Sequence, residues 1–243
     1  MNHLKEFVAT LKTKGLKESC SRGWNHVKRK TFTYGDLLFD VKHGIDTCGQ
    51  KSILDLDIDP SMKGDSISYE PSPVKVVRSI LEALSIAHPN FTFVDFGSGK
   101  GRVLLLASEY PFKKVIGVEL SRGLHEIAEQ NIRKWTSSSS KSTDVASVNM
   151  NALEFRLPEE PLVLFFFTPF LGSVFTEVVN KIRANLTSSR HPIHIVYYGR
   201  NEENIGRLRD LGIGYKKLDL KSTFFETGKF EAHLFVRDAY EHA

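Results

Sequence analysis

Three closely spaced glycines are the first feature of this sequence that points to chemistry. Gly97, Gly99 and Gly101 lie in segment 94–102, between an apolar stretch typical of a β-strand and one typical of a helix. Glycine lets the backbone turn sharply and lets a ligand approach it closely, and the start of the following helix offers free N–H groups. The spacing therefore predicts a loop that holds part of a nucleotide-like cofactor.

Known fingerprints separate the classes of cofactor loop. The dinucleotide pattern GxGxxG needs glycine at position 102, where this chain has Arg102, and the phosphate-binding pattern GxxxxGK[ST] needs Ser or Thr after Lys100. Both patterns fail, which leaves an acidic residue followed by GxGxG. This resembles motif I of the class I S-adenosylmethionine-dependent methyltransferases and implies S-adenosylmethionine as the cofactor. The residues that the resemblance assigns to the cofactor in this loop are Asp95, Gly97, Ser98, Gly99 and Gly101.

Two further positions extend the resemblance. Glu119 ends the second expected strand, 22 residues after Gly97, where a carboxylate can accept hydrogen bonds from ribose hydroxyls. Asn151 follows the third strand, where family members often carry an Asp that contacts the adenine amino group. Its amide oxygen can accept the same hydrogen bond, and a turn-forming Asn is the alternative.

The segment Thr168-Pro169-Phe170 follows a buried strand, at the side of the sheet where ligands bind. Adenine- and glutamine-directed N-methyltransferases often have Asn or Asp followed by Pro-Pro-Tyr here. The present segment is a reduced version, with one hydroxyl in place of an amide. It places Thr168 beside the cofactor and acceptor but does not indicate methylation of a nucleic-acid base, and a plain strand-to-loop junction is the alternative.

Together with motif I, Tyr69-Glu70-Pro71-Ser72 makes the chain resemble a bacterial methyltransferase group. That group is distantly similar to the non-SET (disruptor-of-telomeric-silencing type) histone-lysine methyltransferases, and the resemblance spans roughly residues 36–236. It implies that Tyr69 and Glu70 form a lid over the methionyl end of the cofactor. The alternatives are core packing for Tyr69 and charge complementarity with a helix N-terminus for Glu70.

Methyl transfer to an amine needs a neutral acceptor, and a nearby carboxylate or hydroxyl can take or relay its proton. Candidate catalytic residues by position are Glu70, Thr168 and Tyr197. Tyr198 is an alternative to Tyr197, but strand alternation points these two side chains to opposite faces, so at most one reaches the site. Two cysteines without zinc spacing and nine histidines without HExxH predict no metal site.

Strands and helices alternate along the chain from about residue 70. A helix is expected to open at Pro73 with Ser72 as its N-cap. The expected strands are 91–96, 114–118, 145–149, 162–167, 193–198, 215–220 and 231–236, and the later helices are 103–108, 124–135, 174–186 and 201–211. The last two strands follow each other with a turn at Gly228. The fold class predicted is α/β: a doubly wound, seven-stranded, mainly parallel sheet with a terminal antiparallel hairpin and a helical N-terminal extension.

Charge is distributed unevenly. The net charge is +4, but residues 1–30 carry eight Lys/Arg against two Glu, so the remaining residues carry −2. Residues 4–11 show helical apolar spacing, and segment 36–65 holds seven Asp against three Lys. We therefore expect two parts, a basic amphipathic arm with an acidic connector (1–66) and a methyltransferase domain (67–243).

The predicted activity is S-adenosylmethionine-dependent methyl transfer to a protein side chain, of the lysine-nitrogen type, or to a small metabolite. The sequence leaves open a non-catalytic cofactor-binding module and an RNA or DNA methyltransferase that uses the basic arm. Peripheral membrane contact through residues 1–30 is also left open. The absence of an apolar leader and the cysteine usage favour a cytoplasmic location.

Overall fold

A computed structural model describes residues 35–138, 144–220 and 230–238. Its strands are β1 (Thr92–Phe96), β2 (Lys114–Glu119), β3 (Asp144–Asn149), β4 (Leu162–Phe166), β5 (Ile193–Gly199), β6 (Gly214–Lys217) and β7 (Glu231–Arg237). Its α-helices are α3 (Val74–Glu82), α4 (Arg102–Ala107), α5 (Arg122–Ser138), α6 (Gly172–Ser188) and α7 (Glu202–Arg209), and residues 35–43 are also helical. Short 3₁₀ turns lie at η1 (Ile53–Asp55), η2 (Pro60–Met62) and η3 (His88–Asn90).

The strands form one sheet in the order β3-β2-β1-β4-β5-β7-β6. The first five strands run parallel, and β7 pairs antiparallel with both β5 and β6. This confirms the predicted seven-stranded, mainly parallel sheet with a terminal hairpin. The expected turn at Gly228 lies outside the described residues.

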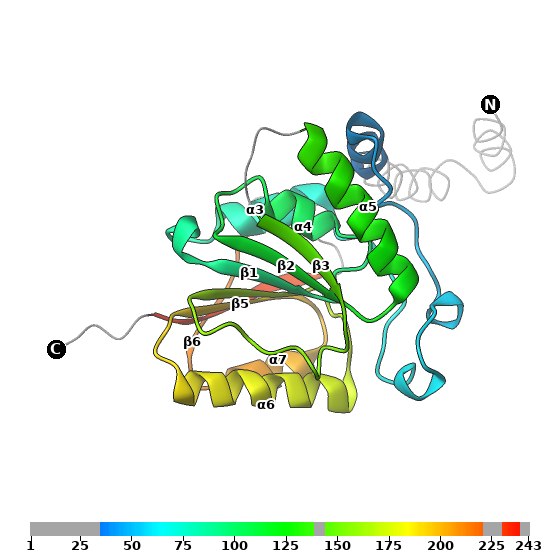
Figure 1. Cartoon of the computed structure of the whole chain (residues 1–243). Coiled ribbons are helices and arrows are strands. Elements are labelled where there is room, and N and C mark those ends of the chain that lie inside the picture. The colour runs from blue at the N-terminus through cyan, green and yellow to red at the C-terminus, as the bar shows by residue number, and fades with distance from the viewer. Residues whose placement is uncertain (1–34, 139–143, 221–229, 239–243) are drawn as a thin grey trace, which may run out of the picture.

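Helices cover both faces of the sheet. Helices α3, α4 and α5 lie on one face, and α6 and α7 lie on the other (Figure 1). Every residue of β1, β4 and β5 is buried, because each of these strands contributes alternate side chains to a core on either side. In β4, Val163 and Phe165 enter the first core, whereas Leu164 and Phe166 enter the second.

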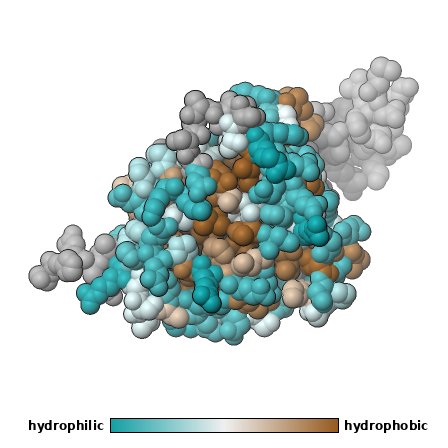
Figure 2. Space-filling model, in the orientation of Figure 1, coloured by the Kyte–Doolittle hydropathy of each residue, from teal (hydrophilic) through white to brown (hydrophobic). Residues whose placement is uncertain are grey.

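Irregular chain takes the place of a crossover helix between β3 and β4. Residues 150–161 contain no helix or strand, and Phe155 packs edge-on against Phe96 with ring centroids 5.7 Å apart. In Figure 2, apolar side chains gather in the middle of the visible face and polar side chains surround them. The apolar side chains of this segment, such as Phe155 and Leu157, thus cover the sheet where a helix usually would.

The segment before the domain packs onto it. Phe39, on helix 35–43, lies against Trp135 of α5 with ring centroids 5.6 Å apart. Asp36 accepts a hydrogen bond from the backbone N–H of Val74 at 3.1 Å and so caps α3. The expectation that Ser72 caps this helix is therefore wrong: Pro73 occupies the cap position without a side-chain hydrogen bond. The basic arm, including residues 4–11, lies outside the described residues.

Candidate active site and cofactor pocket

The glycine loop joins β1 to α4 in a left-handed backbone conformation. Gly97, Gly99 and Gly101 have φ angles of 74°, 54° and 85°, which L side chains rarely adopt. Packing adds a second constraint, because a Cβ at Gly97 would collide with Pro169 and one at Gly99 would collide with the ring of Tyr69. The first two glycines are thus required by neighbouring protein as well as by the turn.

A cavity of about 340 Å³ opens at the carboxyl ends of β1, β2 and β4. Its walls come from four parts of the chain: residues 56–72 of the connector, the glycine loop with Arg102, the segments that follow β2 and β3, and residues 167–174 after β4. Gly97 and Gly99 line it, but Gly101 does not. A Cβ at Gly101 would approach that of Ala128 to 3.1 Å, so this glycine allows the close packing of α4 on α5.

Two buried carboxylates face the cavity from adjacent strands, Asp95 on β1 and Glu119 on β2. Burial, and then the charge of Glu119, raises the pKa of Asp95 well above its usual value. Burial also raises the pKa of Glu119 to about 7, although hydrogen bonds from the backbone of Ser121 and Gly99 favour its charged form. A cationic ligand group beside this pair would relieve the cost of their charge.

The residues present fit S-adenosylmethionine. The carboxylate of Glu119 accepts the N–H of Gly99 at 2.7 Å and that of Ser121 at 2.8 Å, and each oxygen keeps a lone pair for a ribose hydroxyl. The hydroxyl oxygen of Ser98 is buried and has no hydrogen-bond partner within the described ranges. A ligand could therefore supply the hydrogen bond that this hydroxyl lacks. The carboxylate of Asp95, which also lines the cavity, is suited to bind an amino group.

Asn151 lines the cavity at the end beyond β3, as expected. Its side-chain oxygen accepts the backbone N–H of Leu153 at 2.9 Å, and its amide nitrogen lies 3.8 Å from the sulfur of Met62. The oxygen is therefore engaged in a local turn, which is the alternative that the sequence left open, and one lone pair of that oxygen remains for an adenine amino group.

Tyr69 and Glu70 lie where a lid is expected. The ring of Tyr69 covers Gly99, and its hydroxyl donates a hydrogen bond to the carbonyl of Thr47 at 2.8 Å. Burial raises the pKa of Tyr69 well above its usual value, so it stays neutral. Glu70 is exposed and lies on the cavity wall. Both residues thus line the cavity, Tyr69 as a fixed wall and Glu70 with a carboxylate open to water.

The segment after β4 brings Thr168 to the cavity in a strained conformation. Thr168 has φ 39°, and it is the one non-glycine residue in the left-handed region among those the structure describes. Its hydroxyl donates to the carbonyl of Tyr198 at 3.2 Å. Strain of this kind persists only where surrounding contacts hold it, and here Pro169 is held against Gly97.

The structure does not bring Tyr197 to the cavity. Its side chain is fully buried in the core under α6 and α7, and its hydroxyl accepts a hydrogen bond from Asn204 at 3.3 Å. Tyr198 points into the opposite core and is absent from the cavity wall as well. The proposed catalytic role of Tyr197 therefore does not agree with its position, and its alternation with Tyr198 is as expected.

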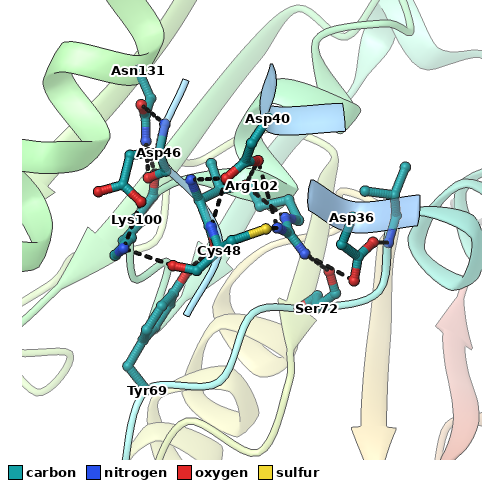
Figure 3. Close-up of polar contacts among 11 residues, drawn as sticks. Asp36, Asp40, Asp46, Cys48, Tyr69, Ser72, Lys100, Arg102 and Asn131 are labelled. Atoms are coloured by element: carbon teal, nitrogen blue, oxygen red, sulfur yellow. Dashed lines mark hydrogen bonds and ion pairs between the residues drawn. The ribbon is translucent and has the colours of Figure 1, made fainter. Parts of the chain in front are cut away.

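A buried charged network, which the sequence analysis missed, fastens the connector to the glycine loop (Figure 3). The guanidinium of Arg102 lies 3.2 Å from the carboxylate of Asp36 and 3.6 Å from that of Asp40, and it donates to the hydroxyl of Thr47 at 2.7 Å. Its other contacts are the carbonyl of Ser72 and the sulfur of Cys48. The sequence contains one indication of this network: segment 36–65 has more Asp than Lys, and the glycine loop contains two cations, Lys100 and Arg102.

Lys100 adds a second fastening on the other side of the loop. Its ammonium donates to the carboxylate of Asp46 and to the carbonyl of Cys48, both at 2.7 Å. Asn131 of α5 donates to the carbonyl of Lys100 at 2.9 Å and to that of Asp46 at 2.8 Å. Lys100 and Arg102 therefore hold protein, and neither side chain is available to bind a phosphate group.

None of the helices in the described ranges is long and apolar enough to cross a membrane.

Comparison with known proteins agrees with this geometry. A family model described as "Histone methylation protein DOT1" matches residues 65–156. A protein-lysine N-methyltransferase of Saccharolobus islandicus is 35% identical over 69 residues, which cover 28% of this chain and 42% of that relative. That match covers less than half the length of the relative. The region matched by the family model contains the glycine loop, Glu119 and Asn151.

Solved structures show the same fold. The precorrin-6y C5,15-methyltransferase of Geobacter metallireducens superposes with a TM-score of 0.50 at 15% identity, over 76% of this chain and 95% of that one. The methyltransferase domain of a bacterial Hen1 gives a TM-score of 0.50 at 11% identity, over 67% of this chain and 98% of that one. The family match, the fold and the residues around the cavity together make the chain similar to the class I S-adenosylmethionine-dependent methyltransferases, with a resemblance to the DOT1 type.

Proposed function

We propose that this protein methylates the side-chain nitrogen of a lysine in a protein acceptor. The observation that carries the proposal is the shape of the cavity, which continues from the glycine loop past Thr168 to Phe170 and the connector. Its far part has apolar and aromatic walls, which suit the four-carbon stem of a lysine. The protein-lysine N-methyltransferase relative supports the same acceptor class.

The bound cofactor supplies a methyl group on a positively charged sulfur. In this scheme Asp95 and Ser98 hold its amino-acid end, Glu119 accepts its ribose hydroxyls, and Tyr69 closes the methionyl side against water. Pro169, held against Gly97, fixes the acceptor segment relative to the glycine loop. These contacts would hold the cofactor and the acceptor in fixed relative positions, as in-line methyl transfer requires.

A lysine must lose a proton before its nitrogen can attack. Glu70 is the exposed carboxylate on the cavity wall, so it is our candidate to receive that proton, directly or through water. The methyl group would pass from the cofactor's sulfonium, which would leave as a neutral thioether, to this neutral nitrogen, while Glu70 would hold the released proton. Thr168 shapes the wall beside the acceptor through its backbone, because its hydroxyl is engaged by the carbonyl of Tyr198.

The test is transfer of radiolabelled methyl groups into cell extract separated into protein, nucleic-acid and small-molecule fractions. We expect label in protein, recovered as methyl-lysine after hydrolysis, and no label with Gly97→Arg, which fills the loop. Glu70→Gln should lower kcat while leaving S-adenosylhomocysteine affinity unchanged. Label confined to nucleic acid or to small molecules would overturn the lysine proposal, and absence of label in every fraction would favour a non-catalytic module.

A further inference from the structure

Residues 51–70 form a strap across the mouth of the cavity. At its neck, Lys51 and Tyr69 exchange two backbone hydrogen bonds of 3.1 and 2.9 Å, which close the strap into a loop. Leu56, Ile58 and Met62 line the cavity from the strap. The strap therefore covers the cavity from the glycine loop, where Tyr69 lies, to Asn151, which Met62 contacts.

Asp57 fastens one side of the strap to the start of α5. One carboxylate oxygen accepts the backbone N–H of Gly123 at 2.8 Å, and the other accepts the hydroxyl of Ser121. The first N–H groups of a helix have no partner within the helix, so Asp57 caps α5 from a different segment of the chain.

Asp65 fastens the other side to the start of α6 in the same way. One carboxylate oxygen accepts the N–H groups of Ser173 at 3.0 Å and Val174 at 3.2 Å, and also the hydroxyl of Ser173. Its own carbonyl accepts the N–H of Leu171 at 2.8 Å. Residue 66 of the strap also forms a bridge with Phe170, in the segment that we assign to the acceptor.

The glycine in the first turn of α6 makes room for the carboxylate of Asp65. A Cβ at Gly172 would lie 2.5 Å from a carboxylate oxygen of Asp65, whereas one at Gly123 would meet Asp57 at an ordinary contact distance of 3.5 Å. By contrast, the strap between the two aspartates is weakly packed: residues 59–62 are all exposed. Two caps at its sides and one closed neck thus hold the strap in place.

We propose that Asp57 and Asp65 are positioning residues that latch the strap over the cofactor, so that cofactor exchange requires both caps to open. The strap would turn about its neck at Lys51 and Tyr69, and the sheet would not change. This inference rests on the proposed cofactor site, because it is the cofactor that the strap encloses. It does not depend on the nature of the methyl acceptor.

The direct test is the dissociation rate of S-adenosylhomocysteine, measured by stopped-flow displacement. Loss of a helix cap weakens a helix end by roughly 2- to 30-fold in equilibrium terms, so Asp57→Ala and Asp65→Ala should each raise the dissociation rate by a factor in this range. Asp65→Asn should keep the slow dissociation rate of the wild type, because asparagine caps a helix about as well as aspartate does. Asp55→Ala, an exposed carboxylate on the same strap, is the matched control and should leave the rate unchanged.

A second measurement keeps the proposal independent of catalysis. Amide hydrogen exchange in the ligand-free protein should be faster across residues 51–70 in both alanine variants and unchanged in Asp55→Ala. Dissociation rates equal to that of the wild type in both alanine variants would overturn the latch. If the wild-type protein binds no S-adenosylhomocysteine, the cofactor assignment is overturned. In that case the latch is tested by hydrogen exchange alone, and unchanged amide exchange across residues 51–70 in both alanine variants would overturn it.

Discussion

Arg102 offers the sharpest test of how the connector is held. Its side chain is 2% exposed, and those of Asp36 and Asp40 are 9% and 6% exposed, so all three charges are removed from water. Replacing Arg102 by Met keeps the length of the side chain but leaves two buried carboxylates without their cation. Breaking a buried ion pair by removing one partner typically costs about 3–5 kcal/mol.

The remaining contacts determine where in this range the cost falls. Asp40 keeps hydrogen bonds from the N–H groups of Thr47 at 2.6 Å and Cys48 at 2.7 Å, and from the hydroxyl of Thr47. Asp36 keeps one, from Val74. We therefore expect Arg102→Met to lower the free energy of unfolding by about 3–4 kcal/mol, because Asp40 stays well solvated by protein and Asp36 does not. For a chain of this size, that corresponds to a fall in Tm of roughly 6–16 °C.

Urea unfolding followed by circular dichroism measures this cost. Burial already raises the pKa of Asp36, and loss of Arg102 removes an influence that lowers it. A raised carboxyl pKa means stability that is present at low pH and lost as pH rises, so the cost of Arg102→Met should be smaller at pH 5 than at pH 8. Adding Asp36→Asn and Asp40→Asn should recover part of the loss by removing the unpaired charges.

Arg78→Met is the matched control. Arg78 forms a two-point ion pair with Glu109, at 2.6 and 2.8 Å, but its side chain is 38% exposed. Water screens this pair, so its removal should cost no more than about 1 kcal/mol. The reasoning would be refuted if Arg102→Met cost less than its control, or if its cost increased at low pH.

Three further changes test the site. Burial raises the pKa of Glu119 to about 7, and ribose hydroxyls favour its charged form, so calorimetry should show S-adenosylhomocysteine binding more tightly as the pH rises from 6 to 8. Glu119→Gln should remove that pH dependence and weaken binding roughly 10- to 100-fold. Gly99→Ala should lower the free energy of unfolding by about 1–3 kcal/mol, because its Cβ meets Tyr69 at a positive φ, and an unchanged urea midpoint would count against the observed packing. Tyr197→Phe should lower stability by about 1 kcal/mol and leave kcat within about two-fold; a large loss of kcat alone would restore a catalytic role.

Local pattern was sufficient for most of the fold. The alternation of buried strands with amphipathic helices predicted the sheet and both helical layers, because side-chain periodicity reflects which faces are buried. The glycine loop and Glu119 were also readable, because their roles depend on spacing along one β-α-β unit. Their placement on the cavity wall follows from the parallel register, which pairs Phe96 with Val118 at neighbouring strand ends.

Contacts between distant segments could not be read in this way. The sequence suggested that Ser72 caps α3, whereas Asp36 provides the cap, and it did not reveal that Gly101 packs against Ala128. Tyr197 shows the same limit, since alternation predicts that it and Tyr198 face opposite sides but not that both sides are core. In each case the partner lies outside the local segment whose pattern was read.

The sequence by itself determined the order of the elements, the glycine loop between β1 and α4 and the carboxylate at the end of β2, because these follow from periodicity and from spacing along the chain. Only the tertiary structure decided what four of the seven aspartates of segment 36–65 do. Asp36 and Asp40 neutralise Arg102, while Asp57 and Asp65 cap helices by accepting N–H groups of residues 66 and 108 positions further along the chain. The physical reason is that a buried cation and a free helix N-terminus both attract a carboxylate, and folding alone determines which carboxylate comes within reach of which site.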